Sequence, residues 1–402
     1  MKNPYRPGAA VSPLHLAGRE REVSRFLSMM RGAPELPANL KLTGLRGVGK
    51  SVLLKDFERR ANDDLGWMTS RVQLEPGHNQ DQAITRVILQ QTKKAIEAAS
   101  RAARLRAKVA GAVTAARGLV KVTYQDLDFT LGGGAEAPGD DSVLKALFDA
   151  AQTADDLGYE GYLLMLDEAQ LLRDDKEAAS DHPLSLLVAA VNTLQEMEIP
   201  VGLVLCGLPT LKANLLKART YSERMFRGEE IGRLAGPPAV DAAEAFVKPL
   251  DGTGITVTDC LVARVVEETE GYPYFIQLWG AELWDAATAA GLDVLSEELL
   301  DQVEPDIYRR LDADFYETRV EALTPAEQDL LMATAQCSYP PLKSSDIRTK
   351  TQKADGNVNV LMGRLTDQGV VYRVQKGMYE YTAPKFHGFL ERRAKRLAEV
   401  GR

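Results

Sequence analysis

Eight residues near the N-terminus, 44–51, fit the pattern GxxxxGK[ST], and their flanks constrain the fold of the whole region. The apolar run 40–43 precedes them and a run with helical character, 52–60, follows. A glycine-rich turn between a strand and a helix lets backbone N–H groups surround phosphate oxygens and directs the positive end of the helix at them. The sequence therefore predicts a nucleoside triphosphate site on a P-loop α/β fold.

The residues of this turn have distinct expected roles. Lys50 brings a positive charge to the β- and γ-phosphates, and the hydroxyl of Ser51 binds Mg²⁺. The other expected nucleotide contacts come from Gly44, Arg46, Gly47, Val48, Gly49 and Val52. The alternative, an ordinary glycine-rich turn, is disfavoured because a strand-like run and a helical run flank the motif.

A second motif, at residues 161–168, is an apolar run that ends in Asp167 and Glu168. Such a run is typical of a buried strand of a parallel sheet. We expect Asp167 to hold Mg²⁺, directly or through water, and Glu168 to polarise the attacking water, because phosphoryl transfer depends mainly on positioning and charge compensation. Taken alone, the run could also be a strand that ends in a solvated acidic turn. Its distance from the phosphate loop suits two intervening β–α units and favours the catalytic interpretation.

Length and composition exclude several classes of protein. A chain of 402 residues with 45% apolar residues is expected to form two or three domains with proper cores. Charged residues interrupt the apolar stretches before they reach the roughly 20 residues of a membrane span, and residues 1–13 lack an apolar signal-peptide centre. We therefore expect a soluble, cytoplasmic protein without a membrane partner. The three cysteines and four histidines are scattered, so neither a disulfide framework nor a Cys/His metal site is expected.

Charge is distributed unevenly along the chain. The net charge is −8, yet residues 323–402 contain 13 Lys+Arg and 8 Asp+Glu, a balance of +5. The preceding 322 residues consequently carry −13. The C-terminal segment is thus the part of the chain that is suited to a polyanionic partner.

The order of elements predicts an α/β domain over residues 1–236. Strand-like runs at 67–74, 161–166 and 201–205 alternate with helical runs, which indicates a parallel sheet between two layers of helices. A basic insert, rich in alanine and arginine, lies near residues 95–141. It could follow a phosphate backbone or an acidic partner, or it could be a solvated helix.

Two further domains are expected after the Gly-Pro-Pro sequence at 236–238. Residues 237–322 predict a small helical lid without strands, and residues 323–402 predict a winged helix-turn-helix. The second boundary is marked by Thr324, a good N-cap, and Pro325, a good first helical residue. Helical runs at 325–335, 344–350 and 356–369 are followed by strand-like runs at 370–374 and 378–382, which is the order of a winged helix.

The predicted winged helix offers candidate contacts to double-stranded DNA. Asn359 and Arg364 lie on its third helix, together with Asn357 and Gln368, and Arg373 and Lys376 lie on its wing. Residues of these types read base edges or bind phosphates. Winged helices also serve as protein-docking modules, so a protein partner is the alternative.

Taken together, these motifs resemble the AAA+ and signal-transduction (STAND) ATPases, in particular origin-recognition initiators and transposition regulators. The resemblance implies that the nucleotide is ATP and that Leu16, Ala17 and Arg19 border its base. It also implies a polar sensor at the end of the strand at 201–205. This sequence has Cys206 there in place of the common Asn, so we expect sensing of the γ-phosphate to be impaired and hydrolysis to be slow.

The resemblance suggests two further roles. Residues 222–226 resemble an arginine-finger region, in which Arg224 would complete a neighbouring subunit's site and couple hydrolysis to formation of a homo-oligomer. Residues 271–274 resemble the G-x-P signature of STAND proteins, in which Pro273 contacts the nucleotide. The alternatives are that Arg224 is a surface arginine and that Pro273 simply begins a helix.

Two functional hypotheses follow. In the first, the chain is an ATP-dependent switch that self-associates and engages DNA through its C-terminal domain. In the second, it is a STAND-type regulator whose winged helix holds the lid closed and whose output is recruitment of a protein. A metabolic kinase is disfavoured, because neither the lid nor the winged helix supplies an obvious pocket for a small substrate.

Overall fold

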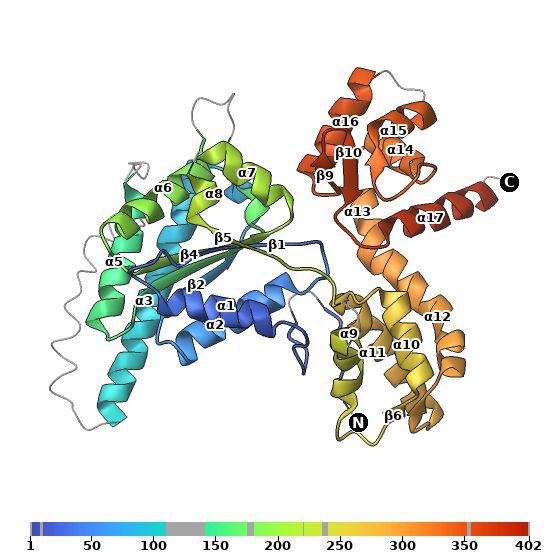
Figure 1. The fold of residues 1–402 in the computed structure, drawn as a ribbon, viewed down its shortest axis with the longest axis horizontal. Coiled ribbons are helices and arrows are strands. Elements are labelled where there is room, and N and C mark those ends of the chain that lie inside the picture. The colour runs from blue at the N-terminus through green and yellow to red at the C-terminus, as the bar shows by residue number, and fades with distance from the viewer. Residues whose placement is uncertain are drawn as a thin grey trace. The chain divides into compact units, whose positions relative to one another are not determined.

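A computed structural model describes residues 2–8, 11–109, 141–174, 181–219, 221–234, 240–351 and 355–400. Contacts between residues divide the chain into two compact units (Figure 1). The sheet unit comprises Arg19–Thr43 and Lys50–Glu230. The helical unit comprises Met1–Gly18, Gly44–Gly49 and Ile231–Arg402. No helix in the described ranges is both long and apolar enough to cross a lipid bilayer.

The sheet unit is built on five parallel strands, which confirms the predicted P-loop α/β fold. Their order in the sheet is β2-β3-β4-β1-β5. The strands are β1 (Asn39–Thr43), β2 (Met68–Gln73), β3 (Tyr162–Asp167), β4 (Val201–Gly207) and β5 (Arg227–Glu230). Because all neighbours are parallel, the carboxyl ends of the strands share one edge of the sheet.

Burial explains which strands the sequence predicts best. All residues of β3 and β4 are buried, as expected of central strands covered on both faces. In β2, buried residues alternate with partly buried or exposed ones. The strand β5, with the sequence RGEE, lies at the edge of the sheet and has no apolar residue, so no hydrophobic pattern could predict it.

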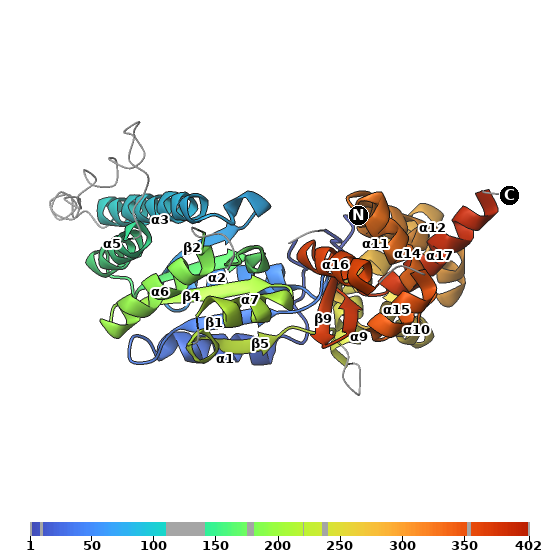
Figure 2. The ribbon, with the colours of Figure 1, turned by 90° about the horizontal axis from the view of Figure 1, so that it is seen from above.

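Helices cover both faces of the sheet, with α1 and α2 on one face and α5, α6 and α7 on the other (Figures 1 and 2). On the first face, the rings of Phe26 and Phe57 stack with centroids 4.1 Å apart. On the other face, Leu164 and Leu203 belong to the core formed with α3, α5 and α6. The helical elements of this unit are α1 (Glu20–Arg31), α2 (Lys50–Asp63), η1 (Pro76–His78), α3 (Asp81–Val109), α5 (Ser142–Asp156), η3 (Ala169–Leu171), α6 (Pro183–Glu196), α7 (Thr210–Ala218) and α8 (Ser222–Met225).

The region of the basic insert is only partly described. Helix α3 runs without interruption to Val109 and so includes the beginning of the insert. The strand predicted at 121–131, most of the glycine-rich loop after it and the Gly-Pro-Pro boundary at 236–238 lie outside the described residues. Helix α5 was not predicted, although Val143, Leu147 and Ala150 form a regular buried stripe along it.

The helical unit begins with a layer of helices around one apolar core. These are α9 (Val240–Val247), η4 (Lys248–Leu250), α10 (Asp259–Thr269), α11 (Pro273–Ala290), α12 (Glu297–Leu311), the π-helical turn η5 (Asp312–Glu317) and α13 (Thr318–Glu321). The expectation of a region without strands was wrong. Two-residue strands, β6 (Thr256–Val257) and β7 (Val294–Leu295), pair in parallel and are too short to give a sequence pattern.

The C-terminal part of this unit follows the order helix, strand, helix, helix, hairpin, helix. Its elements are α14 (Pro325–Thr334), β8 (Leu342–Lys343), α15 (Ser344–Thr351), α16 (Asp355–Asp367), β9 (Val371–Gln375), β10 (Met378–Tyr381) and α17 (Phe386–Val400). Strands β9 and β10 are antiparallel, and β8 adds to the far edge of β10. Thr324 and Glu327 form a capping box at the start of α14. The division of the chain into domains at 236 and 322 stays a prediction.

Candidate active site

The phosphate loop, Gly44–Gly49, connects the end of β1 to the start of α2. Gly47 and Gly49 have φ angles of +80° and +89°, a left-handed conformation that residues with a Cβ rarely adopt. At Gly44 a Cβ would lie 2.2 Å from the carbonyl oxygen of Ile231, so only glycine fits. Turns of this kind direct successive backbone N–H groups to one side and create an anion-binding concavity.

Helix α2 begins with the two residues that were predicted to contact phosphate and metal. Lys50 is its first residue and Ser51 its second, and both are partly buried. The first N–H groups of a helix have no partner within the helix and carry partial positive charge. The start of α2 is therefore suited to phosphate oxygens.

Asp167 and Glu168 lie at the carboxyl end of β3. In the sheet only β4 separates β3 from β1, the strand that leads into the phosphate loop. Asp167 is 5% exposed, and its Oδ1 accepts a hydrogen bond of 2.9 Å from the N–H of Glu168. Glu168 adopts a left-handed conformation, with φ 57° and ψ 31°, which turns the chain out of the strand. Strain at a non-glycine residue of this kind is concentrated at functional sites.

A residue that the sequence did not single out, Gln170, completes this turn. Its Nε2 donates to Glu168 Oε2 at 2.5 Å, and its Oε1 accepts from the N–H of Leu208 at 3.0 Å. Leu208 follows directly after the end of β4. The only signal in the sequence was a glutamine two positions after the paired acids, and a position on a turn does not reveal what a side chain contacts.

Cys206 is fully buried near the end of β4. Burial raises the pKa of its thiol well above the ordinary value, the nearby Asp167 raises it further, and Lys50 opposes the rise. These effects require Lys50 and Asp167 to lie within electrostatic reach of the thiol. The predicted positive and negative groups of the site therefore gather around the same strand ends.

The groups present fit a triphosphate with its divalent cation. The buried hydroxyl of Thr43, at the entry to the phosphate loop, has no hydrogen-bond partner among the residues that the structure describes. Apart from its two chain neighbours, no described residue has an atom within 4 Å of the position that a Cβ at Gly49 would take, so the backbone there is open to a ligand. A hydroxyl from Ser51 and a carboxylate from Asp167 are the oxygen ligands that Mg²⁺ prefers.

Several other predicted contacts have defined positions but untested roles. Leu16 is partly buried and Ala17 is buried in the core of the helical unit. Arg19 is buried in the sheet unit and forms an ion pair of 3.9 Å with Glu22. Pro273 is the first residue of α11, and Arg224 is exposed on the short helix α8.

The candidate DNA contacts are all on the surface. Asn359 and Arg364 are exposed on α16, Arg373 is exposed on β9, and Lys376 is exposed in the turn between β9 and β10. Exposure is required for contact with DNA but does not show it, so these four roles stay predictions.

Comparisons with known proteins agree with this geometry. Residues 15–205 match the family model described as the AAA ATPase domain, and residues 313–390 match a family described as a domain of unknown function (DUF8462). The fold resembles the Walker-type ATPase of Pyrococcus abyssi, with 16% identity, coverage of 93% of this chain and 96% of that chain, and a TM-score of 0.58. It also resembles the Aeropyrum pernix ORC2 protein, solved as ADPNP–ADP complexes, with 14% identity, coverage of 97% and 98%, and a TM-score of 0.55.

No curated protein matched the sequence. At these low identities the two solved structures show the fold alone, whereas the residues that match the family model include the phosphate loop and the strand that carries the paired acids. Over residues 15–205 the chain is therefore similar to the AAA ATPase domain family, and the P-loop α/β fold of the sheet unit agrees with that similarity.

Proposed function

We propose that the chain binds ATP with Mg²⁺ and hydrolyses it slowly, as a molecular switch. One observation carries this proposal. The phosphate loop follows β1 and the paired acids follow β3, and these two parallel strands are separated only by β4.

Lys50 would compensate the charge of the β- and γ-phosphates, and Ser51 and Asp167 would hold the metal. Glu168 would orient a water molecule and take its proton as the water attacks the γ-phosphorus and ADP leaves. Bound Mg²⁺ supplies further neutralisation of phosphate charge.

Nucleotide binding is tested by equilibrium titration of a fluorescent ATP analogue. We expect micromolar binding by the wild type and loss of at least about 100-fold in affinity for Lys50→Ala, because a point charge at the phosphates is removed. The matched control is Lys55→Ala, five residues further along α2, which should bind as the wild type does. Equal affinity of the Lys50→Ala variant would refute the proposed site.

We further propose that ATP drives self-association, with Arg224 acting in a neighbouring subunit's site. Its exposure on α8 supports this role, because an arginine finger must reach out of its own subunit. The test is particle size by light scattering with and without ATP, for the wild type and for Glu168→Gln, which should retain bound ATP. We expect the Glu168→Gln variant to assemble in the presence of ATP. We expect the double variant with Glu168→Gln and Arg224→Ala not to assemble. A size that never responds to nucleotide would contradict this part of the proposal.

The C-terminal elements support a winged helix that engages double-stranded DNA. The order α14, β8, α15, α16, β9 and β10 is the order of a winged helix, and α16 is the third helix. Substitution of Arg364, Arg373 and Lys376 by alanine should weaken binding to DNA. It should also make the negative slope of log affinity against log salt shallower by about one for each DNA phosphate that is no longer neutralised. A slope that stays unchanged would argue against binding of DNA by these residues.

A second function, a STAND-type regulator that recruits a protein, is favoured by how the helical unit holds the phosphate loop. The N–H of Arg46 donates to the carbonyl oxygen of Thr382 at 2.9 Å, and the N–H of Tyr274 donates to the carbonyl oxygen of Gly47 at 3.2 Å. Thr382 directly follows β10, and Tyr274 is the second residue of α11. The C-terminal elements thus contact the nucleotide loop directly, as expected of a domain that senses or restrains nucleotide binding.

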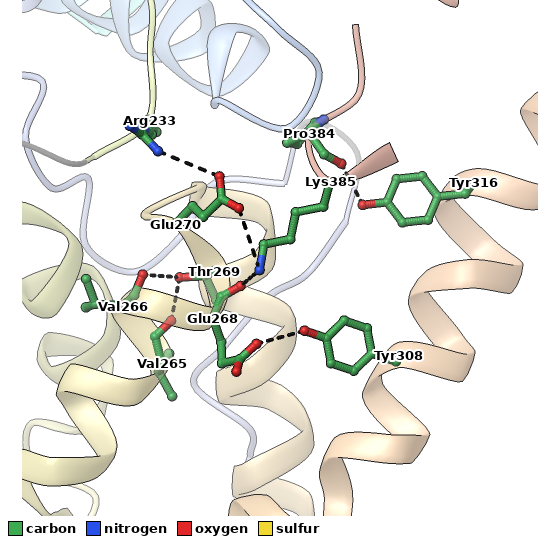
Figure 3. A network of polar contacts seen from close by, with 10 residues as sticks. All are labelled: Arg233, Val265, Val266, Glu268, Thr269, Glu270, Tyr308, Tyr316, Pro384 and Lys385. Carbon is green, nitrogen blue, oxygen red and sulfur yellow. Dashed lines mark hydrogen bonds and ion pairs between the residues drawn. The ribbon is translucent and has the colours of Figure 1, made fainter. Parts of the chain in front are cut away.

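A polar network supports the same interpretation (Figure 3). The ammonium group of Lys385 donates to the carbonyl oxygen of Glu268 at the end of α10 and lies 3.8 Å from the carboxylate of Glu270. Glu270 also forms an ion pair of 3.6 Å with Arg233. Glu270 directly precedes residues 271–274, so Lys385 connects the end of the hairpin to the turn that carries Pro273.

One measurement separates the two functions. Binding of duplex DNA in the presence of ATP, followed as a function of salt concentration, should show a steep salt dependence for the DNA-associated switch. The protein-recruiting regulator should bind DNA only with a dissociation constant weaker than about 100 μM, which is the weak end of ordinary non-specific binding.

A further inference from the structure

We propose that Gln170 is the positioning residue of this site and that its carboxamide ties the carboxylate of Glu168 to the end of β4. This inference rests on the proposed function, because it assigns a role in ATP hydrolysis. Gln170 itself is not expected to touch the nucleotide; it acts through Glu168.

Hydrogen-bond chemistry fixes how the Gln170 carboxamide is oriented. A carboxylate accepts hydrogen bonds and a backbone N–H donates them, so the group between them must present its NH₂ to Glu168 and its oxygen to Leu208. The distances, 2.5 Å from Nε2 to Glu168 Oε2 and 3.0 Å from the N–H of Leu208 to Oε1, agree with this orientation. The reverse orientation would set two acceptors against each other and two donors against each other.

The backbone of Gln170 is held independently of its side chain. Asn214, on α7, donates from Nδ2 to the carbonyl oxygens of Gln170 at 2.9 Å and Leu172 at 3.1 Å. The N–H of Leu171 donates to the carbonyl oxygen of Glu168 at 3.0 Å and closes the turn. The carboxamide therefore extends from a fixed backbone position, and the length of the Gln170 side chain sets where Glu168 Oε2 lies.

The end of β4 is shaped to admit the carboxamide. A Cβ at Gly207 would lie 2.4 Å from Gln170 Oε1 and 3.1 Å from its backbone nitrogen. Alanine at this position would displace the Gln170 side chain or the turn that carries it. Glycine at 207 is therefore a condition for the contact between Gln170 and Leu208.

This link reaches the strand that leads into the phosphate loop. In the parallel pairing of β1 with β4, Gly207 lies opposite Thr43, the last residue before the loop. A displacement at the end of β1 and β4 would be passed through Leu208 and Gln170 to Glu168. The arrangement therefore connects the position of the general base to the strand ends beside the phosphate site.

The first test compares Gln170→Ala with a matched control, Gln195→Ala, in the full chain. Gln195 is also partly buried, and its Nε2 donates to the carbonyl oxygen of Val201 and to Asn39, away from the paired acids. We expect Gln170→Ala to lower kcat at least about 10-fold with KM for ATP within about twofold, as for a group that acts mainly in the transition state. Gln195→Ala should lower thermal stability without changing kcat. If the two variants behave alike, or if Gln170→Ala keeps the wild-type kcat, the inference is wrong.

The pH profile separates positioning of the base from support of the turn. In Gln170→Glu, a carboxylate replaces the donor beside Glu168, and two like charges within hydrogen-bond distance resist ionisation together. The acidic limb of kcat against pH should move to higher pH by about one unit or more. A purely structural role of Gln170 would lower the rate at all pH values and leave the limb in place.

Gly207→Ala provides a variant that leaves both side chains intact. It should reproduce the loss of kcat by moving the carboxamide, and the double variant with Gln170→Ala should be little worse than either single variant. Additive losses would show that Gly207 and Gln170 act independently and would contradict the link.

A binding measurement separates the role of Gln170 from ATP binding itself. Absence of binding of a non-hydrolysable ATP analogue to the wild type would refute the proposed function itself. Where turnover is too slow to follow, the ratio of affinities for ADP with aluminium fluoride and for the non-hydrolysable analogue replaces kcat, because only the former mimics the transition state. Gln170→Ala should reduce this ratio at least about 10-fold, and an unchanged ratio would overturn the inference.

Discussion

The N–H of Arg46, inside the phosphate loop, donates a hydrogen bond of 2.9 Å to the carbonyl oxygen of Thr382. Thr382 is itself fixed, because its N–H and its hydroxyl both bond back to the segment before β9, at Val370 and Gly369. The bond between Arg46 and Thr382 joins backbone atoms, so side-chain substitution does not remove it directly. Its strength depends on what anchors the neighbouring residues.

Lys385→Met is predicted to speed nucleotide release. Lys385 anchors the segment after Thr382 to the end of α10, where the negative end of the helix favours a cation. Loss of a hydrogen bond from a charged donor costs about 1.5–3 kcal/mol, which corresponds to roughly a 10-fold or greater change in an equilibrium constant. We expect dissociation of a fluorescent ADP analogue, followed by stopped flow, to accelerate by about this factor.

Lys385→Arg is the control for this prediction, because it keeps a positive donor at the end of α10 and should keep a rate close to that of the wild type. Equal dissociation rates for Lys385→Met and the wild type would show that the C-terminal segment does not restrain the loop.

Asp167→Asn is predicted to remove the advantage that Mg²⁺ gives to ATP binding. The amide keeps the shape of the carboxylate but loses the charge that a hard divalent cation requires. We expect similar affinity for ATP in the presence of a chelator and a loss of at least about 10-fold in the gain produced by Mg²⁺. Calorimetric titration with and without the metal measures both quantities.

Asp174→Asn serves as the matched control for Asp167. Asp174 accepts from the N–H groups of Leu184 and Ser185 at the start of α6 and so has a structural role in the same unit. It should lower stability without changing the effect of Mg²⁺. The same loss of metal dependence in both variants would contradict the assignment of Asp167.

The sequence was sufficient to predict the parts of the site that depend on local backbone chemistry. Gly47 and Gly49 have the positive φ angles that the motif requires, and Lys50 begins α2. Asp167 ends a strand that is buried throughout, as its run of apolar residues indicates. Such features can be predicted because residue type and neighbours along the chain determine them.

Other features depend on contacts between distant segments and could not be predicted in this way. Gln170 gains its role only because β4 brings Leu208 beside it. The edge strand β5 lies beside β1 although its residues are charged, so pairing rather than hydrophobicity defines it. Helix α17 was missed although Phe386, Phe389 and Leu390 are buried along it, because the prediction ended with the hairpin.

Phe57→Ala is predicted to be strongly destabilising. Phe57 is fully buried on α2, and its ring lies nearly parallel to that of Phe26, with an interplanar angle of 3°. Removal of a buried aromatic side chain typically costs about 3–5 kcal/mol, because it loses apolar burial and leaves a cavity. Urea unfolding should show this loss, whereas Leu397→Ala, at a side chain that is 56% exposed, should change stability by less than about 0.5 kcal/mol. A loss below about 1 kcal/mol for Phe57→Ala would contradict the packing of α1 on α2.

The stability of the helical unit is predicted to fall on mild acidification because of His387. Burial lowers the pKa of His387 below its ordinary value of 6.5, although Glu391, 3.6 Å away, raises it in part. Its other close neighbours are the rings of Tyr339 and Tyr381, and burial raises the pKa of Tyr339 to about 12, so that ring stays neutral. As the pH falls through about 6.5, the unfolded state binds a proton before the folded state does, so the free energy of unfolding decreases.

Two variants test the sign of this effect in urea unfolding between pH 5 and 8, followed by tryptophan fluorescence. Below about pH 6.5, His387→Phe should reduce the slope of the free energy of unfolding against pH. The reduction should be at most the slope that corresponds to one bound proton. Glu391→Gln should deepen it, because the group that partly favours the charged imidazole is removed. A decrease that is the same in the wild type and in both variants would show that His387 titrates alike in the folded and unfolded chain, and that its burial between Tyr339 and Tyr381 does not penalise the charged form.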